Sequence, residues 1–358
     1  MKTLRAKKKI AVIFGGNSME YEVSLQSAFA VLENLDAGKY DVIPIGITRN
    51  GAWYHYTGKY HCIPDNTWVQ DGENLRSLGV SPDCTRKALI ALSEHEYTFI
   101  QIDAAFPVLH GKNGEDGSVQ GLFELAGIPV VGCNTLASAL CMDKERAHKL
   151  VGASGISVPS SVTLHSYDRK RSQGEVAAGL SYPLFVKPVR SGSSFGITKV
   201  MEKEKLSEAI EKAFQYDDAV IVEEAVEGFE VGCAILGKEA LIIGRVDEIE
   251  LHGGFFDYTE KYTLQSSRIH MPARIDAQTE KRIQDTAAAI YRILGCSGFA
   301  RVDMFLTPSG ELVFNEVNTI PGCTLHSRYP NMMKGIGLSF PNMLDRLIEV
   351  SIGDDEAE

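Results

Sequence analysis

Near its C-terminal end the chain carries four polar residues whose spacing could bring them together around a phosphate. They are Arg301, Asp303, Glu316 and Asn318. A β-hairpin over residues 299–318, with a two-residue turn at Pro308-Ser309, would pair position 303 with 314 and position 301 with 316. Side chains two residues apart on a strand share a face, so all four polar groups would lie on one face. The opposite face would carry Val302, Met304, Val313 and Val317.

Two carboxylates, a carboxamide and a guanidinium on one face suggest a bound cation together with an anion. Mg²⁺ takes oxygen ligands, usually one or two carboxylates plus phosphate oxygens. Arg301 would then contact the phosphate charge that the metal does not neutralise. The hairpin therefore predicts a magnesium–triphosphate site. A solvated face with a chance ion pair is the alternative, because Arg-x-Asp and Glu-x-Asn are short patterns.

Residues 187–196 form a second candidate phosphate contact. Their sequence, Lys-Pro-Val-Arg-Ser-Gly-Ser-Ser-Phe-Gly, places Lys187 at the root of a loop of small residues between two predicted strands. Such a loop offers backbone N–H and hydroxyl donors to phosphate oxygens. It is not a Walker A loop, since nothing in the chain matches Gly-x4-Gly-Lys-Ser/Thr. A plain surface turn is the alternative.

Further polar candidates lie close to predicted strands. Glu223 and Glu230 belong to one acidic segment. His110 ends an apolar run, and Glu20 follows the Gly15-Gly16 turn. Parallel α/β sheets bind ligands at the carboxyl ends of their strands, which favours a ligand role for the last two. Taken singly, the glutamates also fit a solvated acidic turn and the histidine a loop cap.

The first third of the chain alternates strand-like and helix-like segments. Predicted strands cover residues 10–14, 42–47, 104–109 and 128–132. Predicted helices cover residues 22–35 and 119–126. This alternation is typical of an α/β fold with a doubly wound parallel sheet. We therefore expect an N-terminal doubly wound domain over residues 1–140.

Beyond residue 140 paired strands dominate, which indicates an α+β architecture. Predicted strands cover residues 183–189, 196–201, 219–224 and 230–236, and predicted helices cover residues 205–214 and 279–294. The polar residues 248–267 lack periodicity and predict a long loop. We expect two further domains, over residues 141–235 and 236–358, and the second of these contains the hairpin.

The composition of the 358 residues limits the partners. The formal net charge is −11 and basic residues cluster only near the N-terminus, which argues against nucleic acid and anionic membranes as partners. The first apolar run, residues 10–14, is too short for a signal peptide or a membrane span. The seven cysteines are scattered and include no Cys-x-x-Cys pair, which favours reduced thiols and a cytoplasmic protein.

Taken in order, these segments resemble the D-alanine–D-alanine ligase family of ATP-grasp enzymes. The matching motifs lie within residues 15–25, 110–121, 142–144, 187–196, 223–230, 256–262, 301–303 and 315–327. The resemblance implies an ATP-grasp fold behind an N-terminal doubly wound domain, with ATP held between the central and C-terminal domains. It also implies Mg²⁺ as cofactor, as two ions that Mn²⁺ can replace, and a homodimer.

The resemblance assigns a role to each matching position. Phosphate contacts fall on Lys144, Lys187, Ser193 and Lys261, and adenine or ribose contacts on Glu223, Ala225, Val226 and Glu230. The metal ligands would be Asp303, Glu316 and Asn318, in agreement with the hairpin argument. Glu20 and His110 would hold the first D-alanine, Arg301 and Gly322 the reacting carboxyl group, and Ser327 the carboxylate of the second substrate.

The implied reaction proceeds through an acyl phosphate. The first carboxylate attacks the γ-phosphate of ATP, and the amine of the second substrate then displaces phosphate. Water would destroy the intermediate, so a closing lid is expected. By resemblance, Glu20, Ser193 and Tyr262 would form a hydrogen-bonded set that holds residues 248–267 shut.

Position 328 bears on the choice of second substrate. D-alanine–D-alanine ligases typically carry an apolar residue there, whereas Arg328 resembles the D-alanine–D-serine ligases of the VanG and VanC type. A guanidinium can donate to a serine hydroxyl, and alanine would leave that donor unpaired. D-serine is therefore predicted, unless Arg328 faces solvent or pairs with a lid carboxylate.

D-alanine is the alternative second substrate, because ordinary D-alanine–D-alanine enzymes also carry the tyrosine at position 262. D-lactate is less favoured, since its ligases change that position.

Two other classes of protein compete with this interpretation. Another ATP-grasp ligase could share only the nucleotide site, but the segments around Glu20 and Tyr262 belong to the amino-acid side of the family. A small-molecule binding protein without enzymatic activity would not need the polar face of the hairpin.

Overall fold

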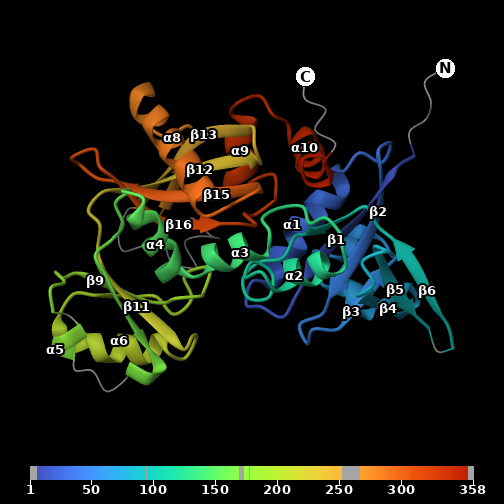
Figure 1. The fold of residues 1–358 in the computed structure, drawn as a ribbon, viewed down its shortest axis with the longest axis horizontal. Helices are drawn as coiled ribbons and strands as arrows, with labels where there is room; N and C mark the ends of the chain where they lie inside the picture. Colours follow the sequence, from blue (N-terminus) through green and yellow to red (C-terminus); the bar gives the residue numbers. More distant parts are fainter. Residues whose placement is uncertain (1–5, 94, 169–172, 177, 252–266, 354–358) are drawn as a thin grey trace.

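The computed structural model of the protein describes residues 6–93, 95–168, 173–176, 178–251 and 267–353. Within these ranges the strands form three sheets, of seven, four and five strands. Figure 1 shows the seven-stranded sheet in blue at one end of the molecule and the four-stranded sheet in green and yellow at the other. The five-stranded sheet, coloured from yellow to red-orange, lies above the space between them.

The seven-stranded sheet has the strand order β6-β5-β4-β3-β2-β1-β7. Its strands are β1 (Lys8–Gly15), β2 (Tyr40–Ile47), β3 (Trp53–Tyr56), β4 (Leu75–Val80), β5 (Ala88–Leu92), β6 (Tyr97–Gln101) and β7 (Ala104–Pro107). Strand β1 pairs in parallel with β2 and β7, which confirms the predicted parallel core. Strands β3 to β6 extend it as an antiparallel meander that the sequence analysis did not predict. The predicted strand over residues 128–132 is reduced to one parallel bridge, Ala105 with Val130.

Helices α1 (Tyr21–Asn34) and α2 (Ser118–Leu125) correspond to the helices predicted over residues 22–35 and 119–126. Helices α3 (Thr135–Met142) and α4 (Lys144–Ala153) were not predicted. The buried stripe of α1 includes Leu25, Ala28, Val31 and Leu32, with spacings of three and four residues, as expected for a helix that covers a sheet. The side chains of Asn134 and Asp143 accept backbone N–H groups and so begin α3 and α4.

The four-stranded sheet, in the order β10-β9-β11-β8, belongs to the smallest lobe. Its elements are β8 (Ser161–His165), α5 (Gln173–Val176), β9 (Leu184–Pro188), β10 (Thr198–Val200), α6 (Leu206–Ala213) and β11 (Ala219–Glu224). The apolar face of α6 contributes Leu206, Ala209, Ile210 and Ala213 to a core shared with Leu184, Val186 and Val222 of the sheet. This lobe therefore has a core of its own.

The five-stranded sheet has the order β14-β13-β12-β15-β16 and is entirely antiparallel. Its strands are β12 (Phe229–Gly237), β13 (Leu241–Leu251), β14 (Ser267–His270), β15 (Gly298–Leu306) and β16 (Leu312–Asn318). The helices that accompany it are α8 (Ala277–Ile293), α9 (Arg328–Lys334) and α10 (Phe340–Ile352). Short 3-10 turns occur at Tyr60–Cys62, Thr67–Gln70, Gly72–Asn74, Ser166–Asp168 and Lys203–Lys205.

Two predicted boundaries in the second half need revision. A division between residues 235 and 236 would cut β12, whose nine residues all belong to the five-stranded sheet. A division between β11 and β12 keeps both sheets whole. The predicted loop over residues 248–267 is also too long, because its first four residues end β13 and its last begins β14.

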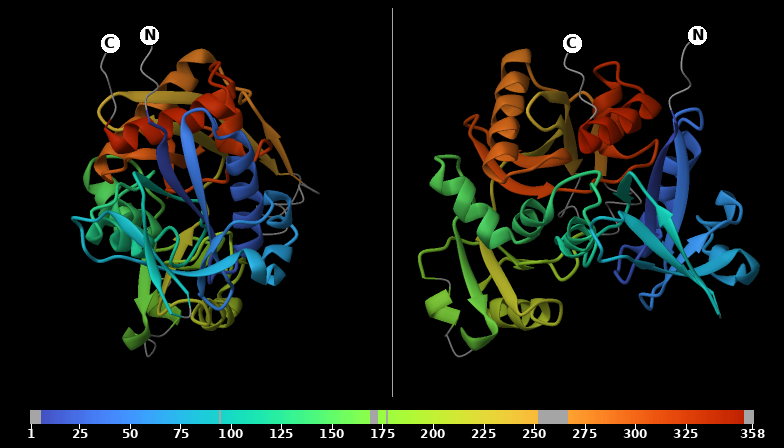
Figure 2. Two further views of the ribbon diagram at one scale, coloured as in Figure 1. Left: turned by 90° about the vertical axis from the view of Figure 1, so that its right-hand side faces the viewer. Right: turned by 45° about the vertical axis from the view of Figure 1, so that its right-hand side comes forward.

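The N-terminal and C-terminal parts share one hydrophobic core. Side chains of β1 and α1, such as Phe14 and Leu25, belong to the same buried cluster as Leu344 and Leu347 of α10. Figure 2 shows α10, in red, beside the blue strands. By contrast, the core of the four-stranded sheet is a separate cluster.

Candidate active site

The polar face of the hairpin exists, although its register differs from the prediction. Asp303 lies opposite Glu316, and Arg301 lies opposite Asn318. The connection is longer than the predicted two-residue turn, since Leu306 pairs with Leu312 and Gly310 adopts a positive φ of 83°. A bulge after Asp303 then shifts the pairing by one residue.

The bulge also changes which apolar side chains cover the other face. Val302, Met304 and Val317 pack into one buried cluster as predicted, but Phe314 joins them in place of Val313. Val313 pairs with Phe305, which lines the cavity on the polar face. At the bulge, two residues of β16 lie opposite one residue of β15, which reverses the alternation of side chains between the two faces. The prediction that Val313 lies on the apolar face was therefore wrong.

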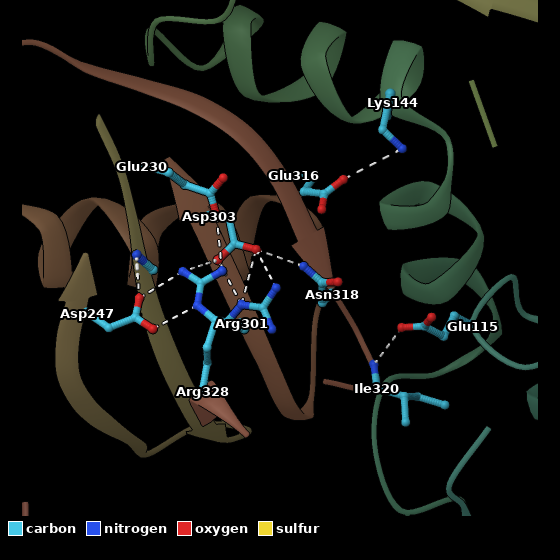
Figure 3. A network of polar contacts seen from close by, with 11 residues as sticks. Glu115, Lys144, Glu230, Asp247, Arg301, Asp303, Glu316, Asn318, Ile320 and Arg328 are labelled. Carbon is cyan, nitrogen blue, oxygen red and sulfur yellow. Dashed lines mark hydrogen bonds and ion pairs between the residues drawn. The ribbon is translucent and has the colours of Figure 1, made fainter. Parts of the chain in front are cut away.

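Hydrogen bonds join three of the four polar side chains, and the fourth turns toward a lysine (Figure 3). Arg301 Nε lies 2.8 Å from Asp303 Oδ1, and Asn318 Nδ2 lies 2.9 Å from Asp303 Oδ2. The Glu316 carboxylate lies 3.6 Å from Lys144 Nζ. Arg301 and Asp303 are almost fully buried. The prediction that these four groups converge on one face of the sheet is confirmed.

The face opens into a cavity of about 490 Å³ between the four-stranded and five-stranded sheets. Ten residues predicted from the sequence line this cavity: Lys144, Lys187, Glu223, Ala225, Val226, Glu230, Arg301, Asp303, Glu316 and Arg328. Phe185, Ile197, Phe229 and Phe305 add apolar walls. A larger hollow, of about 620 Å³, lies beside β3 and contains no residue of the predicted site. The chemistry therefore favours the first cavity.

Two lysines from different elements face the cavity. Lys144 begins α4, and its Nζ donates to the carbonyl oxygen of Ser191 at 2.9 Å. Lys187, on β9, forms an ion pair of 2.5 Å with the buried carboxylate of Glu223. Burial acts to raise the pKa of Glu223, but Lys187 and His148 outweigh it and hold that pKa below its usual value. Glu223 therefore stays ionised beside the two lysines.

The oxygen donors fit a magnesium ion that also binds phosphate. Asp303, Glu316 and Asn318 offer two carboxylates and one carboxamide on neighbouring strands. Among the described residues, no group of three or more histidines, cysteines, aspartates and glutamates could hold a metal ion by itself. Mg²⁺ needs no such cage, because it retains water and takes phosphate oxygens.

A second polar cluster lies where the N-terminal part meets the loop over residues 187–196. Glu20, just before α1, is buried and accepts a hydrogen bond from the hydroxyl of Ser193. A Cβ atom at Gly111 would lie 2.5 Å from Glu20 Oε2, and one at Gly192 would lie 2.9 Å from it. A side chain at either position would require the Glu20 carboxylate to move, and Gly111 also has a positive φ of 72°.

The loop over residues 187–196 is held in an unusual conformation. Ser193 and Ser194 have φ values of 47° and 60°, in the left-handed region that non-glycine residues rarely adopt. Each such residue costs of the order of 1–3 kcal/mol, and such strain gathers at functional sites. This observation favours the phosphate-binding interpretation over a plain surface turn.

The predicted substrate residues at the other loops also lie near this junction. His110 is buried and lies 3.3 Å from the Ser27 hydroxyl. Ser327 lies at the start of α9 and close to Gly322, since a Cβ atom at Gly322 would lie 3.0 Å from the Ser327 hydroxyl. Lys261 and Tyr262 lie outside the described residues, as does most of the predicted lid.

Arg328 is more tightly held than the sequence suggested. Its guanidinium is bidentate to Asp247, with Nε 2.7 Å from Oδ2 and Nη2 2.8 Å from Oδ1, and Nη1 lies 3.0 Å from Glu230 Oε1. Its side chain is only 8% exposed, so the alternative of a solvent-facing arginine is wrong. Burial raises the pKa of Glu230 to about 7, and Arg328 acts against that rise.

Three residues that contact the site were missed by the sequence analysis. Asp247 anchors Arg328, and no sequence signal links positions 81 residues apart. Glu115 joins two loops by accepting the backbone N–H of Gly111 at 2.8 Å and that of Ile320 at 3.2 Å. His148 contacts Asn315 and Glu223 from α4. Glu115 lies inside the motif of residues 110–121, so that motif contained a usable signal.

Comparison with known proteins identifies the family. A family model described as "D-ala D-ala ligase N-terminus" matches residues 9–133, and one described as "D-ala D-ala ligase C-terminus" matches residues 150–349. The chain belongs to the D-alanine–D-alanine ligase family. Members of this family are ATP-dependent ligases, so the chain is an ATP-dependent ligase that uses small-molecule substrates and, in general, Mg²⁺.

Individual relatives in this family carry several names. The chain is 45% identical to the vancomycin/teicoplanin A-type resistance protein VanA of Enterococcus faecium, over 96% of this chain and 98% of the relative. It is 44% identical to a D-alanine–D-alanine ligase of Caldicellulosiruptor bescii, over 97% and 95% of the two chains. The crystal structure of the VanG D-Ala:D-Ser ligase from Enterococcus faecalis is 66% identical, with a TM-score of 0.91, over 97% and 100% of the chains.

These comparisons confirm the predicted ATP-grasp ligase fold and its resemblance to vancomycin-resistance ligases. They do not assign individual site residues, so each role given above to a side chain remains a prediction. Within the described ranges, no helix has the length and apolar character needed to cross a membrane.

Proposed function

We propose that this ligase joins D-alanine to D-serine, using ATP and Mg²⁺, and so supplies a dipeptide for peptidoglycan precursors. The observation that supports D-serine is the 66% identity to a structure described as a D-Ala:D-Ser ligase. It agrees with the presence of Arg328, where an apolar residue was expected for a D-alanine–D-alanine ligase.

The nucleotide end of the reaction is assigned to the cavity between the two sheets. Lys144 and Lys187 would contact the phosphates of ATP, because both ammonium groups line that cavity. Glu223 and Glu230 would accept hydrogen bonds from adenine and ribose, with Ala225 and Val226 contributing their backbone. The apolar walls around Phe185 and Phe305 suit a purine ring.

The hairpin face would hold the metal. Asp303, Glu316 and Asn318 would bind Mg²⁺, as two ions by family resemblance, with Mn²⁺ as a possible substitute. Bound there, the metal would polarise the transferred phosphoryl group. Arg301, already charged and fixed beside Asp303, would stabilise the negative charge that the metal does not neutralise.

The amino-acid end is assigned to the junction around Glu20. The Glu20 carboxylate would bind the ammonium group of the first D-alanine, with His110 nearby and Ser193 orienting the carboxylate. Arg301 and the backbone N–H of Gly322 would stabilise the developing oxyanion when the second amine attacks. Ser327 would bind the carboxylate of the second substrate. Lys261 and Tyr262 keep their predicted roles over the phosphate and the lid.

A competition assay tests the second substrate. Purified protein receives ATP, Mg²⁺, D-alanine and an equal concentration of D-serine, and the dipeptides are separated by mass. We expect D-Ala-D-Ser to exceed D-Ala-D-Ala by about tenfold, which corresponds to about 1.4 kcal/mol of transition-state discrimination. Reactions without Mg²⁺ should yield neither dipeptide. An excess of D-Ala-D-Ala would contradict the proposal.

D-alanine is the second candidate for that site. It is supported by the 44% identity to a protein named D-alanine–D-alanine ligase over nearly the full length of both chains. The same assay separates the two candidates, because mechanism and nucleotide use would be identical.

Two further expectations concern the protein as a whole. The seven cysteines carry no disulfide, which supports a location in the reducing cytoplasm, where free D-amino acids and ATP are available. A homodimer is expected from family resemblance alone. Size-exclusion chromatography with light scattering would measure the mass in solution.

A further inference from the structure

The loop that follows β16 contains Gly322, whose backbone N–H is the proposed oxyanion donor. In the described structure, neither a helix nor a strand covers residues 319–327, which connect β16 to α9. Gly322 is half-buried, whereas Ile320 and Cys323, two residues before it and one after it, are almost fully buried. The direction of the Gly322 N–H therefore depends on contacts that hold this loop from outside.

Glu115 holds the loop on one side of Gly322. Its Oε1 accepts the backbone N–H of Ile320 at 3.2 Å, and its Oε2 accepts that of Gly111 at 2.8 Å. Figure 3 shows the Glu115 side chain directed toward Ile320 from a part of the chain that lies 205 residues earlier. One carboxylate therefore joins the loop after β16 to the loop after β7, with one oxygen for each.

Gly111 connects this contact to the proposed ammonium site. A Cβ atom at Gly111 would lie 2.5 Å from Glu20 Oε2, so the backbone at position 111 lies against the carboxylate proposed to bind the first D-alanine. The ammonium group of that substrate would bind near Gly111 and its reacting carboxyl group near Gly322. Glu115 therefore fixes the distance between the two loops that contact opposite ends of the first substrate.

Ser27 holds the loop on the other side of Gly322. Its side chain is fully buried on α1, and its hydroxyl accepts the backbone N–H of Cys323 at 3.4 Å. The same hydroxyl lies 3.3 Å from Nε2 of His110. The loop after β16 is thus attached to the N-terminal part of the molecule at two points, one on each side of position 322.

We propose that Glu115 is a positioning residue for the oxyanion site, with Ser27 as its weaker counterpart. The proposal rests on the role proposed for Gly322. The two side chains aim the N–H of this glycine at the oxygen that becomes negative when the second amine attacks. Such a donor is effective only when it is fixed in advance, and a displacement of about 1 Å can reduce the rate about 100-fold.

The variant Glu115→Gln tests this proposal with almost no change of shape. The carboxamide has one oxygen, which can keep the shorter bond to Gly111, while its NH2 group faces the N–H of Ile320. We expect kcat to fall about 30-fold, with KM for the first D-alanine and the dissociation constant of ATP within about threefold of the wild type. A dipeptide analogue with a tetrahedral phosphinate in place of the attacked carbonyl should inhibit about 30-fold more weakly. Thermal unfolding would show that the variant is folded.

The variant Ser27→Ala should give the same pattern with a smaller fall in kcat, about fivefold, because a contact of 3.4 Å is weaker. Glu124→Gln is the matched control for Glu115, since Glu124 on α2 also accepts the backbone N–H of another element, that of Thr135 at 2.9 Å. Ser154→Ala is the serine control, because its hydroxyl donates to the carbonyl oxygen of Leu150 on the exposed end of α4. Both controls should leave kcat unchanged.

Several outcomes would overturn the proposal. An unchanged kcat in Glu115→Gln would do so, as would a loss of ATP affinity as large as the loss of kcat. Unchanged inhibition by the phosphinate would show that Glu115 does not act through the oxyanion. A raised Mg²⁺ requirement would instead make Glu115 a contact of the metal, since it borders a hollow of about 30 Å³ together with Glu316 and Asn318.

The choice of second substrate is tested separately, because the oxyanion forms with either amine. If the wild type produced D-Ala-D-Ala, the proposed use of D-serine would fail. A lower kcat and weaker phosphinate inhibition in Glu115→Gln, measured with the amino acid that the wild type prefers, would still support Glu115 as a positioning residue.

Discussion

The two ends of the site are built in different ways. The proposed metal end is one face of a single sheet, in which Asp303 and Glu316 occupy neighbouring strands. The proposed amino-acid end is a junction of loops, where Glu20 from the start of α1 meets Ser193 from 173 residues later in the chain. The first is fixed by strand geometry and the second by the packing of separate parts.

The two ends are therefore sensitive to different kinds of substitution. On the sheet, side-chain direction follows from alternation, and the costly element is charge, since five ionisable side chains form one connected cluster there. At the junction the costly element is backbone conformation. Ser193 and Ser194 hold positive φ values there, and Gly111 leaves space for the Glu20 carboxylate.

The largest effect should come from removing a charge from the sheet face. Asp303→Asn keeps the size of the side chain but removes a predicted metal ligand and the partner of Arg301. We expect kcat to fall about 10³-fold, about 4 kcal/mol, since metal stabilisation of the transferred phosphoryl group is worth several kcal/mol. Coupled measurement of ADP release gives kcat. Asp285→Asn, on the exposed face of α8, is the control and should keep full activity.

A smaller effect, confined to the other end, should follow from Glu20→Gln. The amide can still accept from Ser193 but no longer attracts an ammonium group. We expect KM for the first D-alanine to rise about 10–100-fold, as for the loss of a charge-assisted hydrogen bond. The dissociation constant of ATP, measured without amino acids, should stay within twofold.

The control for this second test is Glu22→Gln, which changes an exposed glutamate in the first turn of the same helix. It should leave both constants unchanged. If Glu20→Gln instead weakened ATP binding tenfold while KM for D-alanine stayed constant, the separation into two ends would be wrong.

The smallest effect concerns the pH dependence of stability through His148, which lies beside Glu223. Burial lowers the pKa of His148 below the ordinary value of 6.5. His148 therefore binds a proton near pH 6.5 in the unfolded chain but stays neutral at that pH in the folded chain. As a result, the free energy of unfolding decreases as pH falls through 6.5. Melting temperatures between pH 8 and pH 5 should fall less steeply in His148→Gln than in the wild type. Parallel slopes would show that His148 does not contribute.

The hairpin shows how far local pattern predicts the site. Alternation of polar and apolar residues placed Arg301, Asp303, Glu316 and Asn318 on one face, and this holds because strand geometry repeats every two residues. The predicted register was wrong, because the turn at Gly310 is longer than two residues and the bulge after Asp303 shifts the pairing by one residue. Neither the loop length nor the bulge leaves a periodic signal.

The same distinction applies to the fold. The parallel core around β1, the amphipathic helices α1 and α8, and the lobe built on β9 and β11 were predictable from the sequence, since each is signalled by a pattern of residues close in the chain. The sequence also contained the ordered motifs of the family. It did not predict the antiparallel strands β3 to β6, whose pairing depends on how the connections between them fold.

The hydrogen-bond partners of Arg328 and Glu20 depend on the tertiary structure. Asp247 is 81 residues from Arg328, and Ser193 is 173 residues from Glu20. Contacts of this kind depend on how the sheet, α9 and the loops pack, and no local propensity records them. The sequence thus specified which charged groups the protein has, whereas packing specified which of them share a buried space.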